Sequence, residues 1–506
     1  MKTANRSNKK AAVKPVLPWH IALKCLLCAL LLLAFACFFS AAWFVRVYGR
    51  IGFDSVLYTL TSNLGGVQTG LVLNYLLTGA LPTAVCTTLS CLVILYPWNF
   101  LKGKHALRYG FGIVLALALM VYAAFDVELV DYLIVSSQES EIMLREYKDP
   151  SDVTITFPQQ KRNLIYIMLE SMETTYLSEE LGGGVDENLI PELYTLANDN
   201  INFSNNSGVG GFQEVPGSGW TIGAMVAHTS GVPLKTPDTL TDRFNGYGKD
   251  GVFLPGLTGL TAVLKEHGYY QALMVGSDVR FGGRDAYYEN QGIDKLYDLY
   301  TARKDGIVPK GYYVWWGMED LHLFAYAKQE LLKLSQMDQP FAFTMLTVDT
   351  HHVGGYTCEK CSADHEEKYE NAISCSSRQV AEFVSWLQQQ SFYENTTIVI
   401  VGDHRTMDNG YISRNVDESY TRHIYNCFIN AAATPIQTKN RTFTTVDLFP
   451  TTLAAMGCTI EGDRLGLGVN LFSRKPTLAE RMGYVPFCAE VEKESPYYAE
   501  NFFTAN

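Results

Sequence analysis

The sequence has little charge and no long block of basic residues. Asp, Glu, Lys and Arg make up 18% of the 506 residues, against roughly 25% in ordinary soluble proteins. Hydrophobic residues reach 47%, which excludes a disordered or fibrous chain. The net charge of −12, with basic residues clustered only at the start, argues against a nucleic-acid partner. At roughly 100–200 residues per domain, the length allows two to four domains.

Charge is missing altogether from long stretches near the amino terminus. The uncharged stretches are residues 25–45, 55–101 and 109–125. A helix needs about 20 apolar residues to cross the hydrocarbon core of a bilayer. The predicted membrane spans are residues 20–45, 73–97 and 109–130. Residues 55–66 are too short and too polar for a further span, so we expect them at the membrane interface.

The first span has an alternative interpretation as a cleaved signal peptide, because its start is basic. Its apolar run is longer than an ordinary signal-peptide core and two spans follow, so we expect a retained anchor. Basic residues before the first span and between the second and third predict that both segments are cytoplasmic. They are Lys2, Arg6, Lys9, Lys10, Lys14, Lys102, Lys104 and Arg108. Everything after about residue 133 is therefore expected outside the cytoplasm.

Cysteines are few, and the even number outside the membrane region is compatible with disulfides in an oxidising compartment. These six are Cys358, Cys361, Cys375, Cys427, Cys458 and Cys488. The pattern Cys358-x2-Cys361-x3-His365-x9-Cys375 also fits a zinc site of three cysteines and one histidine. The spacing is irregular for such a site, which favours a disulfide or free thiols in a surface loop.

Beyond residue 160, short apolar runs alternate with longer amphipathic ones. The apolar runs are residues 163–169, 271–276, 341–348 and 396–402. Continuous apolar runs of this length are typical of strands that are covered on both faces. Residues 257–267 and 371–390 have the length and period of helices. This alternation predicts an α/β sandwich with a mostly parallel sheet.

Polar residues with metal-binding side chains follow three of these predicted strands. Glu170 follows the first, His351 lies just after the third, and Asp403 and His404 follow the fourth. Ligands gather at the carboxyl ends of parallel strands, and carboxylate with imidazole suits Mn²⁺, Zn²⁺ or a similar ion. Taken singly, Glu170 is explained equally well as an acid at a helix start, and an Asp-His pair as a capping group. Their joint placement favours a metal site.

A glycine-rich turn with a central threonine is the second chemical signal. Residues 217–225 read GSGWTIGAM, which places Thr221 near the start of a predicted helix. Backbone N–H groups at a helix start attract phosphate, and a metal turns a threonine hydroxyl into a usable nucleophile. The alternative is that Thr221 only caps the helix.

Several ordered motifs resemble one known family. They are residues 163–171 (NLIYIMLES), 219–225 (GWTIGAM), 348–352 (VDTHH), 402–404 (GDH) and 447–471 (DLFPTTLAAMGCTIEGDRLGLGVNL). Together they resemble the phosphoglycerol transferases of the alkaline phosphatase/sulfatase superfamily. This group includes the enzyme that decorates osmoregulated periplasmic glucans and, more distantly, lipoteichoic acid synthase. The resemblance covers roughly residues 135–475.

The resemblance implies a threonine nucleophile, phosphatidylglycerol as donor, and one divalent metal, with Mn²⁺ first and Mg²⁺ or Zn²⁺ as alternatives. By motif, Thr221 is the nucleophile, and the implied metal ligands are Glu170, Thr221, Asp403 and His404. His351 and Arg284 match substrate-binding positions, with Arg280 as a competitor for the arginine. Gly282 stands where lipoteichoic acid synthase has a tryptophan, and Val275 where it has a histidine, so the acceptor stays open.

The function this implies is a multi-pass membrane enzyme. It would move glycerol phosphate from phosphatidylglycerol to an envelope glycan or glycerol-phosphate polymer through a phosphothreonine intermediate, without a nucleic-acid partner. Alternatives are a phosphoethanolamine transferase or sulfatase-like phosphoesterase, and a non-catalytic membrane-anchored sensor. The C/S-x-P-x-R motif of sulfatases proper is absent from the sequence, which disfavours sulfate ester hydrolysis.

The predicted organisation follows the membrane spans and the motifs. It comprises a cytoplasmic tail (1–19), a membrane region (20–133), a linker (134–160), an extracytoplasmic catalytic domain (161–475) and a C-terminal extension (476–506). The linker residues are polar and lack a steady apolar period, apart from one short helical stretch.

Overall fold

The computed structural model describes residues 19–49, 52–53, 56–57, 69–95, 105–235 and 252–504. They belong to two compact units, which are Met1–Phe44 with Gly70–Asp126, and Val45–Thr69 with Val127–Asn506. We call these the membrane unit and the catalytic unit, after the roles that the sequence leads us to expect. The predicted cytoplasmic tail lies almost wholly outside the described residues, as does most of the predicted interfacial segment 55–66.

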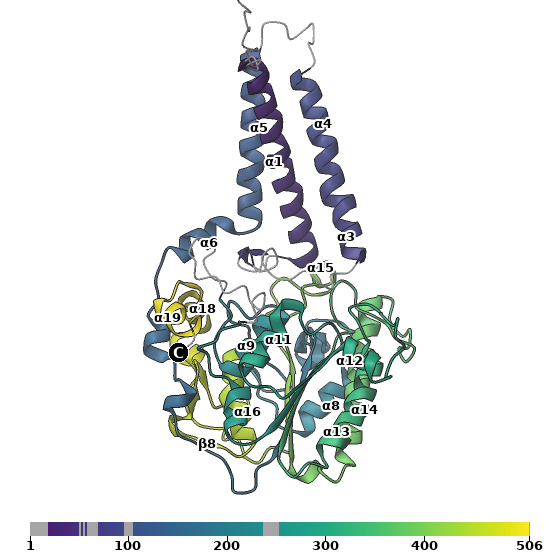
Figure 1. Cartoon of the computed structure of the whole chain (residues 1–506), viewed down its shortest axis with the longest axis vertical. Coiled ribbons are helices and arrows are strands. Elements are labelled where there is room, and N and C mark those ends of the chain that lie inside the picture. The colour runs from purple at the N-terminus through teal and green to yellow at the C-terminus, as the bar shows by residue number, and fades with distance from the viewer. Residues whose placement is uncertain are drawn as a thin grey trace, which may run out of the picture. The chain divides into compact units, whose positions relative to one another are not determined.

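The membrane unit consists of long apolar helices (Figure 1). They are α1 (Trp19–Tyr48), α3 (Thr69–Tyr75), which continues through η1 (Leu76–Ala80) into α4 (Leu81–Leu95), and α5 (His105–Asp126). Three stretches are long and apolar enough to cross a membrane: Ile21–Tyr48, Gly70–Leu95 and Ala106–Asp126. Small side chains such as those of Ala34 and Ala116 are fully buried between the helices, whereas the larger Leu26 is 67% exposed. The structure therefore has three helical stretches that could cross a membrane, where the sequence predicts spans.

The catalytic unit is built on a six-stranded sheet in the order β4-β3-β5-β2-β6-β7. Its strands are β2 (Asn163–Leu169), β3 (Tyr270–Val275), β4 (Lys295–Tyr297), β5 (Phe341–Leu346), β6 (Thr396–Gly402) and β7 (Asn426–Ile429). All neighbours are parallel except β7, which runs antiparallel to β6. Two small antiparallel pairs, β1 (Ile155–Thr156) with β8 (Thr459–Ile460) and β9 (Arg464–Leu465) with β10 (Gly468–Val469), stand apart from this sheet. The predicted α/β class with a mostly parallel sheet is confirmed.

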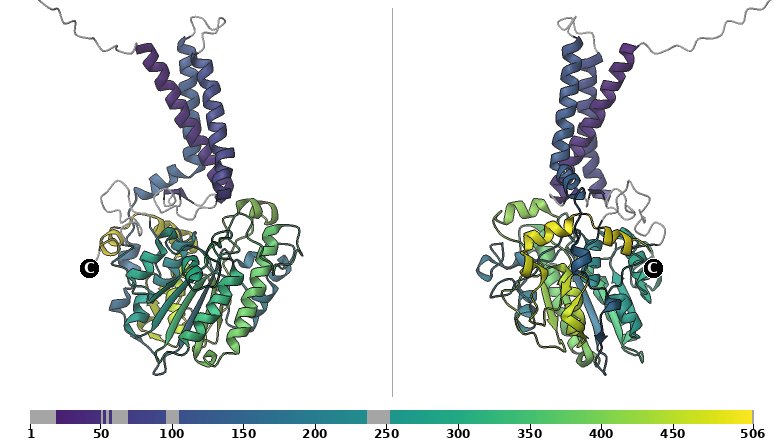
Figure 2. Two further views of the ribbon diagram at one scale, coloured as in Figure 1. Left: turned by 45° about the vertical axis from the view of Figure 1, so that its right-hand side comes forward. Right: turned by 90° about the vertical axis from the view of Figure 1, so that its left-hand side faces the viewer.

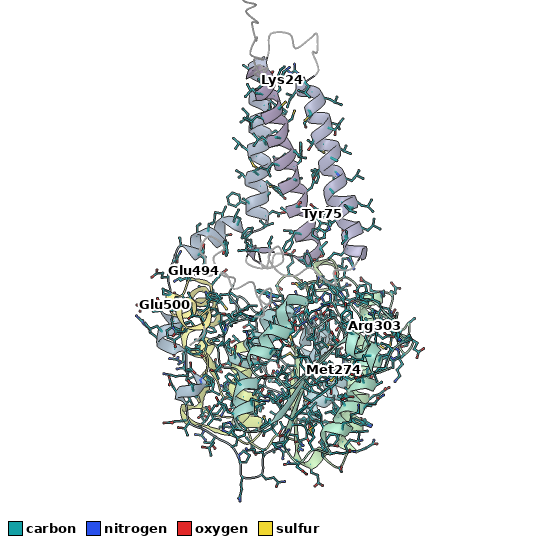
Figure 3. The ribbon with its side chains drawn as sticks, in the orientation of Figure 1. Lys24, Tyr75, Met274, Arg303, Glu494 and Glu500 are labelled. Carbon is teal, nitrogen blue, oxygen red and sulfur yellow. The ribbon has the colours of Figure 1, made fainter. Side chains whose placement is uncertain are left out.

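The central strands are apolar throughout because both faces of the sheet are covered. Along β2, Tyr166 and Met168 point into one apolar cluster, while Ile165 and Ile167 point into another on the opposite face. Successive side chains of a strand alternate between its two faces, so each face receives every second residue. Figure 2 shows the helical layers on either side of the sheet, and Figure 3 places Met274 of β3 inside it.

Each face of the sheet has its own set of helices. The first cluster is formed with α9 (Thr221–Ser230), α10 (Leu260–Glu266), α11 (Arg284–Asn290) and α16 (Leu448–Ala455). The second is formed with α8 (Pro191–Asp199), α12 (Leu299–Lys304), α13 (Asp320–Leu334), α14 (Lys368–Gln388) and α15 (Asn409–Asn415). The short 3₁₀ turns are Pro150–Asp152, Thr174–Tyr176, Glu179–Leu181, Phe281–Gly283, Tyr393–Asn395, Thr445–Asp447 and Glu461–Asp463. The helices predicted at 257–267 and 371–390 correspond to α10 and α14.

The two ends of the catalytic unit pack into the same core. The leading segment contains α6 (Leu129–Ser136) and α7 (Ile142–Glu146), and the trailing one α17 (Leu478–Met482), α18 (Tyr484–Glu492) and α19 (Pro496–Phe502). Ile142 and Tyr147 share an apolar cluster with Phe487 and Phe502. Glu146 forms ion pairs with Arg464 and Arg481, at 2.9 and 2.7 Å. Residues 134–160 and 476–504 are thus integral to this fold.

Candidate metal centre and nucleophile

Three predicted ligands meet where neighbouring strands end. In the parallel pairing of β2 with β6, Leu169 lies opposite Gly402, so the next residues, Glu170 and Asp403, emerge side by side. His404 follows Asp403 directly. The side chains of Glu170, Asp403 and His404 are buried, and one ligand atom from each lies within 4.8 Å of the others. The sheet therefore brings together the residues that the sequence pattern selected.

The hydrogen bonds around these side chains leave ligand atoms directed at one point. His404 donates from Nδ1 to the carbonyl of Arg405 at 2.7 Å, which leaves Nε2 3.4 Å from Glu170 Oε1 and 3.4 Å from Asp403 Oδ2. Asp403 Oδ1 accepts from the backbone N–H groups of Ser171 and His404. Asp403 Oδ2 is buried and accepts no hydrogen bond from the described residues. A buried carboxylate oxygen without a donor and an oriented imidazole are features of a metal site.

The charges at this site are crowded. Burial and the neighbouring Glu170 carboxylate raise the pKa of Asp403 to about 8. Burial lowers the pKa of His404, but the Asp403 and Glu170 carboxylates outweigh it and raise the pKa to about 9. Two adjacent carboxylates repel each other in a buried site unless a proton or a cation lies between them. A divalent cation bound by two carboxylates and an imidazole fits this donor set.

Thr221 reaches the same point from a different element. It is the first residue of α9, and the N-cap position belongs to Trp220, so the interpretation of Thr221 as a helix cap is wrong. Its Oγ1 lies 3.4 Å from Glu170 Oε2 and 3.5 Å from His404 Nε2. These separations are long for hydrogen bonds, so the hydroxyl is held beside the ligand atoms without being fully engaged by them.

The turn before α9 fixes where that helix begins. Gly217 has a φ of +86°, and a Cβ there would lie 2.5 Å from the carbonyl oxygen of Leu234, so only glycine fits. The Ser218 hydroxyl donates to the carbonyl of Val215 at 2.8 Å and accepts from its N–H at 3.1 Å. Gly217 therefore allows the backbone of this turn to approach Leu234 closely, and this approach positions Thr221.

His351 lies beyond the end of β5 and is buried. Its ring contacts Trp316, at 4.3 Å between centroids, and His352, at 4.4 Å. Nδ1 donates to the carbonyl of His352 at 2.6 Å. Burial lowers the pKa of His351, while the charge on Glu170 opposes that shift. The ring is therefore neutral near pH 7, with Nε2 available as a proton acceptor.

The two arginines considered for the substrate site differ in their surroundings. Arg284, at the start of α11, is 3% exposed and donates to Ser277 Oγ at 2.8 Å and to the carbonyl of Asp278 at 2.6 Å. Its charge contributes to the lowered pKa of His351. The Arg280 side chain is 61% exposed and pairs with Asp278 at 2.7 Å. This arrangement favours Arg284 as the buried cation that belongs with His351.

Sequence reasoning missed His228, which joins α9 to the metal-ligand loop. The Tyr166 hydroxyl donates to Nδ1 at 3.0 Å, and Nε2 donates to the carbonyl of Asp403 at 3.2 Å. Burial lowers the pKa of His228 to about 3, so the ring stays neutral. His228 lies about two turns beyond Thr221 on the same helix, but a histidine inside a helix has no distinctive sequence motif.

The loop after β6 is also anchored by ion pairs that the sequence did not reveal. The backbone N–H and Nε of Arg405 both donate to Glu214, at 2.6 Å each. Arg422 binds Glu173, whose Oε1 also accepts from the backbone N–H of Thr406 at 2.8 Å. These arginines line a cavity of about 370 Å³, together with Glu214 and Trp220. Trp220 directly precedes Thr221 in the sequence, so one wall of the cavity adjoins the start of α9.

Comparison with known proteins gives the family. The family model described as Sulfatase matches residues 162–458. Phosphoglycerol transferase I of Escherichia fergusonii is 30% identical over 370 residues, which are 70% of this chain and 45% of that protein. The protein of the same name from Citrobacter koseri is 31% identical over 375 residues, again 70% of this chain and 45% of the relative. The chain thus spans about half the length of the curated relatives it matches.

A solved structure shows the same fold. It is the integral membrane protein lipooligosaccharide phosphoethanolamine transferase A from Neisseria meningitidis, with a TM-score of 0.50 and 13% identity. The similarity covers 86% of this chain and 84% of that one. The matched family region contains β2, β6 and α9, the elements that carry Glu170, Asp403, His404 and Thr221. Because the family model covers more than half of the chain, this protein belongs to the sulfatase family.

Proposed function

We propose that this chain is a membrane-bound phosphoglycerol transferase that takes glycerol phosphate from phosphatidylglycerol. The acceptor would be a hydroxyl of an envelope glycan or glycerol-phosphate polymer. The observation that carries the proposal is the placement of Thr221 Oγ1 within 3.5 Å of Glu170 and His404. The names of the two relatives that are 30% and 31% identical support the choice of glycerol phosphate as the group transferred.

The proposed reaction uses Thr221 twice. Its Oγ loses a proton and forms a bond to the donor phosphorus, while the bond from phosphorus to the diacylglycerol oxygen breaks and that oxygen takes a proton. An acceptor hydroxyl then bonds to the same phosphorus, and the bond to Thr221 breaks. The threonine is restored, and the two half-reactions are separated by a phosphothreonine ester.

The ligand set supports one divalent ion. Glu170, Asp403, His404 and Thr221 would hold it, with Mn²⁺ as the first candidate for a site of carboxylates and imidazole. Such an ion, when bound, favours the deprotonated hydroxyl and offsets the negative charge of a phosphate. The ion pairs of Glu214 and Glu173 keep the loop that bears His404 in place for this role.

The remaining roles fall to His351 and Arg284. The Arg284 guanidinium would bind a phosphate oxygen of the donor headgroup, as planar arginine side chains do readily. The neutral His351 ring would receive the proton of the acceptor hydroxyl at Nε2, since Nδ1 is committed to the carbonyl of His352. We place the catalytic unit outside the cytoplasm of a multi-pass membrane protein, where envelope acceptors are found.

Intact-mass spectrometry tests the proposal directly. The full chain in detergent, loaded with Mn²⁺, is incubated with phosphatidylglycerol or with phosphatidylethanolamine and no acceptor. A glycerol-phosphate adduct from the first lipid, absent from Thr221→Ala, is the expected result. An adduct formed only from phosphatidylethanolamine would assign the chain to phosphoethanolamine transfer. A metal-loaded protein that forms no adduct and releases no diacylglycerol would overturn the proposal.

A further inference from the structure

Three cysteines gather at a second location in the catalytic unit. Cys358 and Cys361 lie in the segment after β5, and Cys375 lies on α14. The Cys358 sulfur is 3.7 Å from that of Cys361 and 3.9 Å from that of Cys375, and one sulfur from each lies within 4.8 Å of the others. No disulfide links the cysteines that the structure describes.

This arrangement corrects the expectation of thiols in a surface loop. Cys358 and Cys375 are buried, at 7% and 2% exposure, and Cys375 belongs to a helix. His365 does not join the three sulfurs. Its Nε2 lies 3.0 Å from Ser374 Oγ instead. The cluster is therefore a set of three thiols without the histidine of the sequence pattern.

The sulfur separations match those around a tetrahedral zinc ion. With Zn–S bonds of about 2.3 Å, the edge of the tetrahedron between two sulfurs is about 3.8 Å. The two sulfur pairs that include Cys358 lie within about 0.1 Å of that edge, at 3.7 and 3.9 Å. A disulfide would instead require about 2.05 Å between two of the sulfurs.

The surroundings are arranged to stabilise thiolates. The backbone N–H of Cys358 donates to the Cys361 sulfur at 3.2 Å. Gln379 donates from Nε2 to Cys375 at 3.5 Å and to Cys358 at 3.9 Å. Donors of this kind surround sulfur ligands in metal sites.

Thiolates gathered this closely would repel one another. A divalent cation between them removes that repulsion, and its binding releases the thiol protons.

We propose that Cys358, Cys361 and Cys375 bind one zinc ion as three thiolates, with a water in the fourth position on the partly exposed Cys361 side. Thiolate ligands select soft ions, whereas the oxygen and nitrogen donors at Glu170, Asp403 and His404 suit harder ones. The two sites would therefore hold different metals. This inference does not depend on the proposed transferase activity.

The zinc would fasten α14 to the loop that carries His351. The Tyr356 N–H donates to the carbonyl of Asp349 at 2.7 Å, just upstream of Cys358. From α14, the Tyr369 hydroxyl donates to the carbonyl of Thr350 at 2.9 Å. A zinc ion bound by Cys375 and Cys358 would add a further link between α14 and this loop, and its role would be structural.

Cobalt substitution distinguishes the two metal sites. The full chain, purified in detergent, is stripped with a chelator and titrated with Co²⁺. Strong thiolate-to-cobalt charge-transfer absorption in the near ultraviolet is expected from the wild-type chain and from His404→Ala, which lacks a ligand of the other site. Cys361→Ser should lose that absorption, whereas Cys458→Ser, a matched change at a cysteine outside the cluster, should keep it.

Zinc content and thiol state complete the test. Elemental analysis should find one zinc per chain that Cys361→Ser loses and Cys458→Ser retains. Intact mass after alkylation under denaturing conditions should show all three thiols reduced. A disulfide among the three cysteines, or a reduced wild-type chain that gives no thiolate absorption with Co²⁺, would overturn the proposal. The wild-type spectrum decides the matter even if a cysteine variant fails to fold.

Discussion

Thr221 carries an uncharged hydroxyl into a group of acidic and basic side chains, and the proposed chemistry depends on that oxygen. Thr221→Ala should lower diacylglycerol release from phosphatidylglycerol by about a thousandfold or more, since removal of a nucleophile leaves only binding and charge stabilisation. Thr221→Ser should keep part of the activity. The thermal unfolding midpoint of both variants should stay close to that of the wild type. Wild-type turnover by Thr221→Ala would show that another residue attacks the phosphorus.

His404 contributes the only imidazole among the three buried ligands. His404→Ala should lose stoichiometric metal, because a missing ligand leaves an incomplete coordination shell. The several kcal/mol that a bound ion contributes to such a reaction correspond to a loss of activity of about a thousandfold. His322→Ala, on the partly exposed side of α13, is the control and should retain metal. Full manganese content in His404→Ala by elemental analysis would move the metal site elsewhere.

Arg284 and Arg280 provide a comparison between a buried and an exposed guanidinium. Arg284→Lys should raise the KM for phosphatidylglycerol about tenfold, because lysine cannot reproduce a planar two-point contact with phosphate. Arg280→Lys should leave that KM unchanged, since its side chain is 61% exposed and paired with Asp278. Steady-state kinetics in mixed micelles measures both values. The reverse pattern would assign the headgroup contact to Arg280.

Among the individual site residues, the sequence predicted the candidate metal ligands that follow strands. It missed a residue whose contacts are with distant parts of the chain. Glu170, Asp403 and His404 were found because a strand end is visible as the last apolar residue of a run. His228 was missed because its partners, Tyr166 and the Asp403 carbonyl, are 62 and 175 positions away. A hydrogen bond between segments so distant in sequence leaves no local pattern.

Among the elements, α7 offers a test of how the leading segment is held. Burial alone would raise the pKa of Glu146, but Arg481 and Arg464 hold it below its usual value. A carboxylate with a lowered pKa stabilises the fold above its unfolded-state pKa, and that contribution disappears as the pH falls through the folded-state value. Glu146→Gln should therefore cost about 1 kcal/mol at neutral pH and nothing in strong acid.

Thermal unfolding of the full chain across pH measures this difference. Glu141→Gln is the control, because Glu141 and its partner Arg145 are 62% and 73% exposed and their pairing contributes little. A destabilisation by Glu146→Gln that persists unchanged in strong acid would show that packing of the side chain, and not its charge, is responsible.

The elements were predictable where burial made them uniform. The runs at 163–169 and 396–402 match β2 and β6 residue for residue, because central strands are apolar on both faces. β4 and β7 were missed. They are only three and four residues long and lie at the sheet edges, where a short run cannot be distinguished from a loop.

For the whole molecule, the distribution of basic residues predicts the orientation. A reporter enzyme that is active only outside the cytoplasm, fused after residue 140, should be active, because the basic segments before the first span and between the second and third stay inside. Fluorescence from a reporter that folds only in the cytoplasm, fused at the same point, would contradict both the orientation and the use of envelope acceptors. A fusion after residue 100 should give the opposite result and serves as the control.

The closure of the catalytic unit by its own two ends has a practical consequence for protein production. A fragment cut at residues 161 and 475, where the sequence motifs suggest boundaries, would lack Tyr147 and Phe502, whose rings lie 5.1 Å apart in the core. It would also lack Ser140, whose N–H donates to the carbonyl of Glu494 at 2.8 Å. Such a fragment would expose apolar surface to water and aggregate on expression. A soluble version should run from about residue 138 to the end of α19, so that both closing segments stay with the domain they complete.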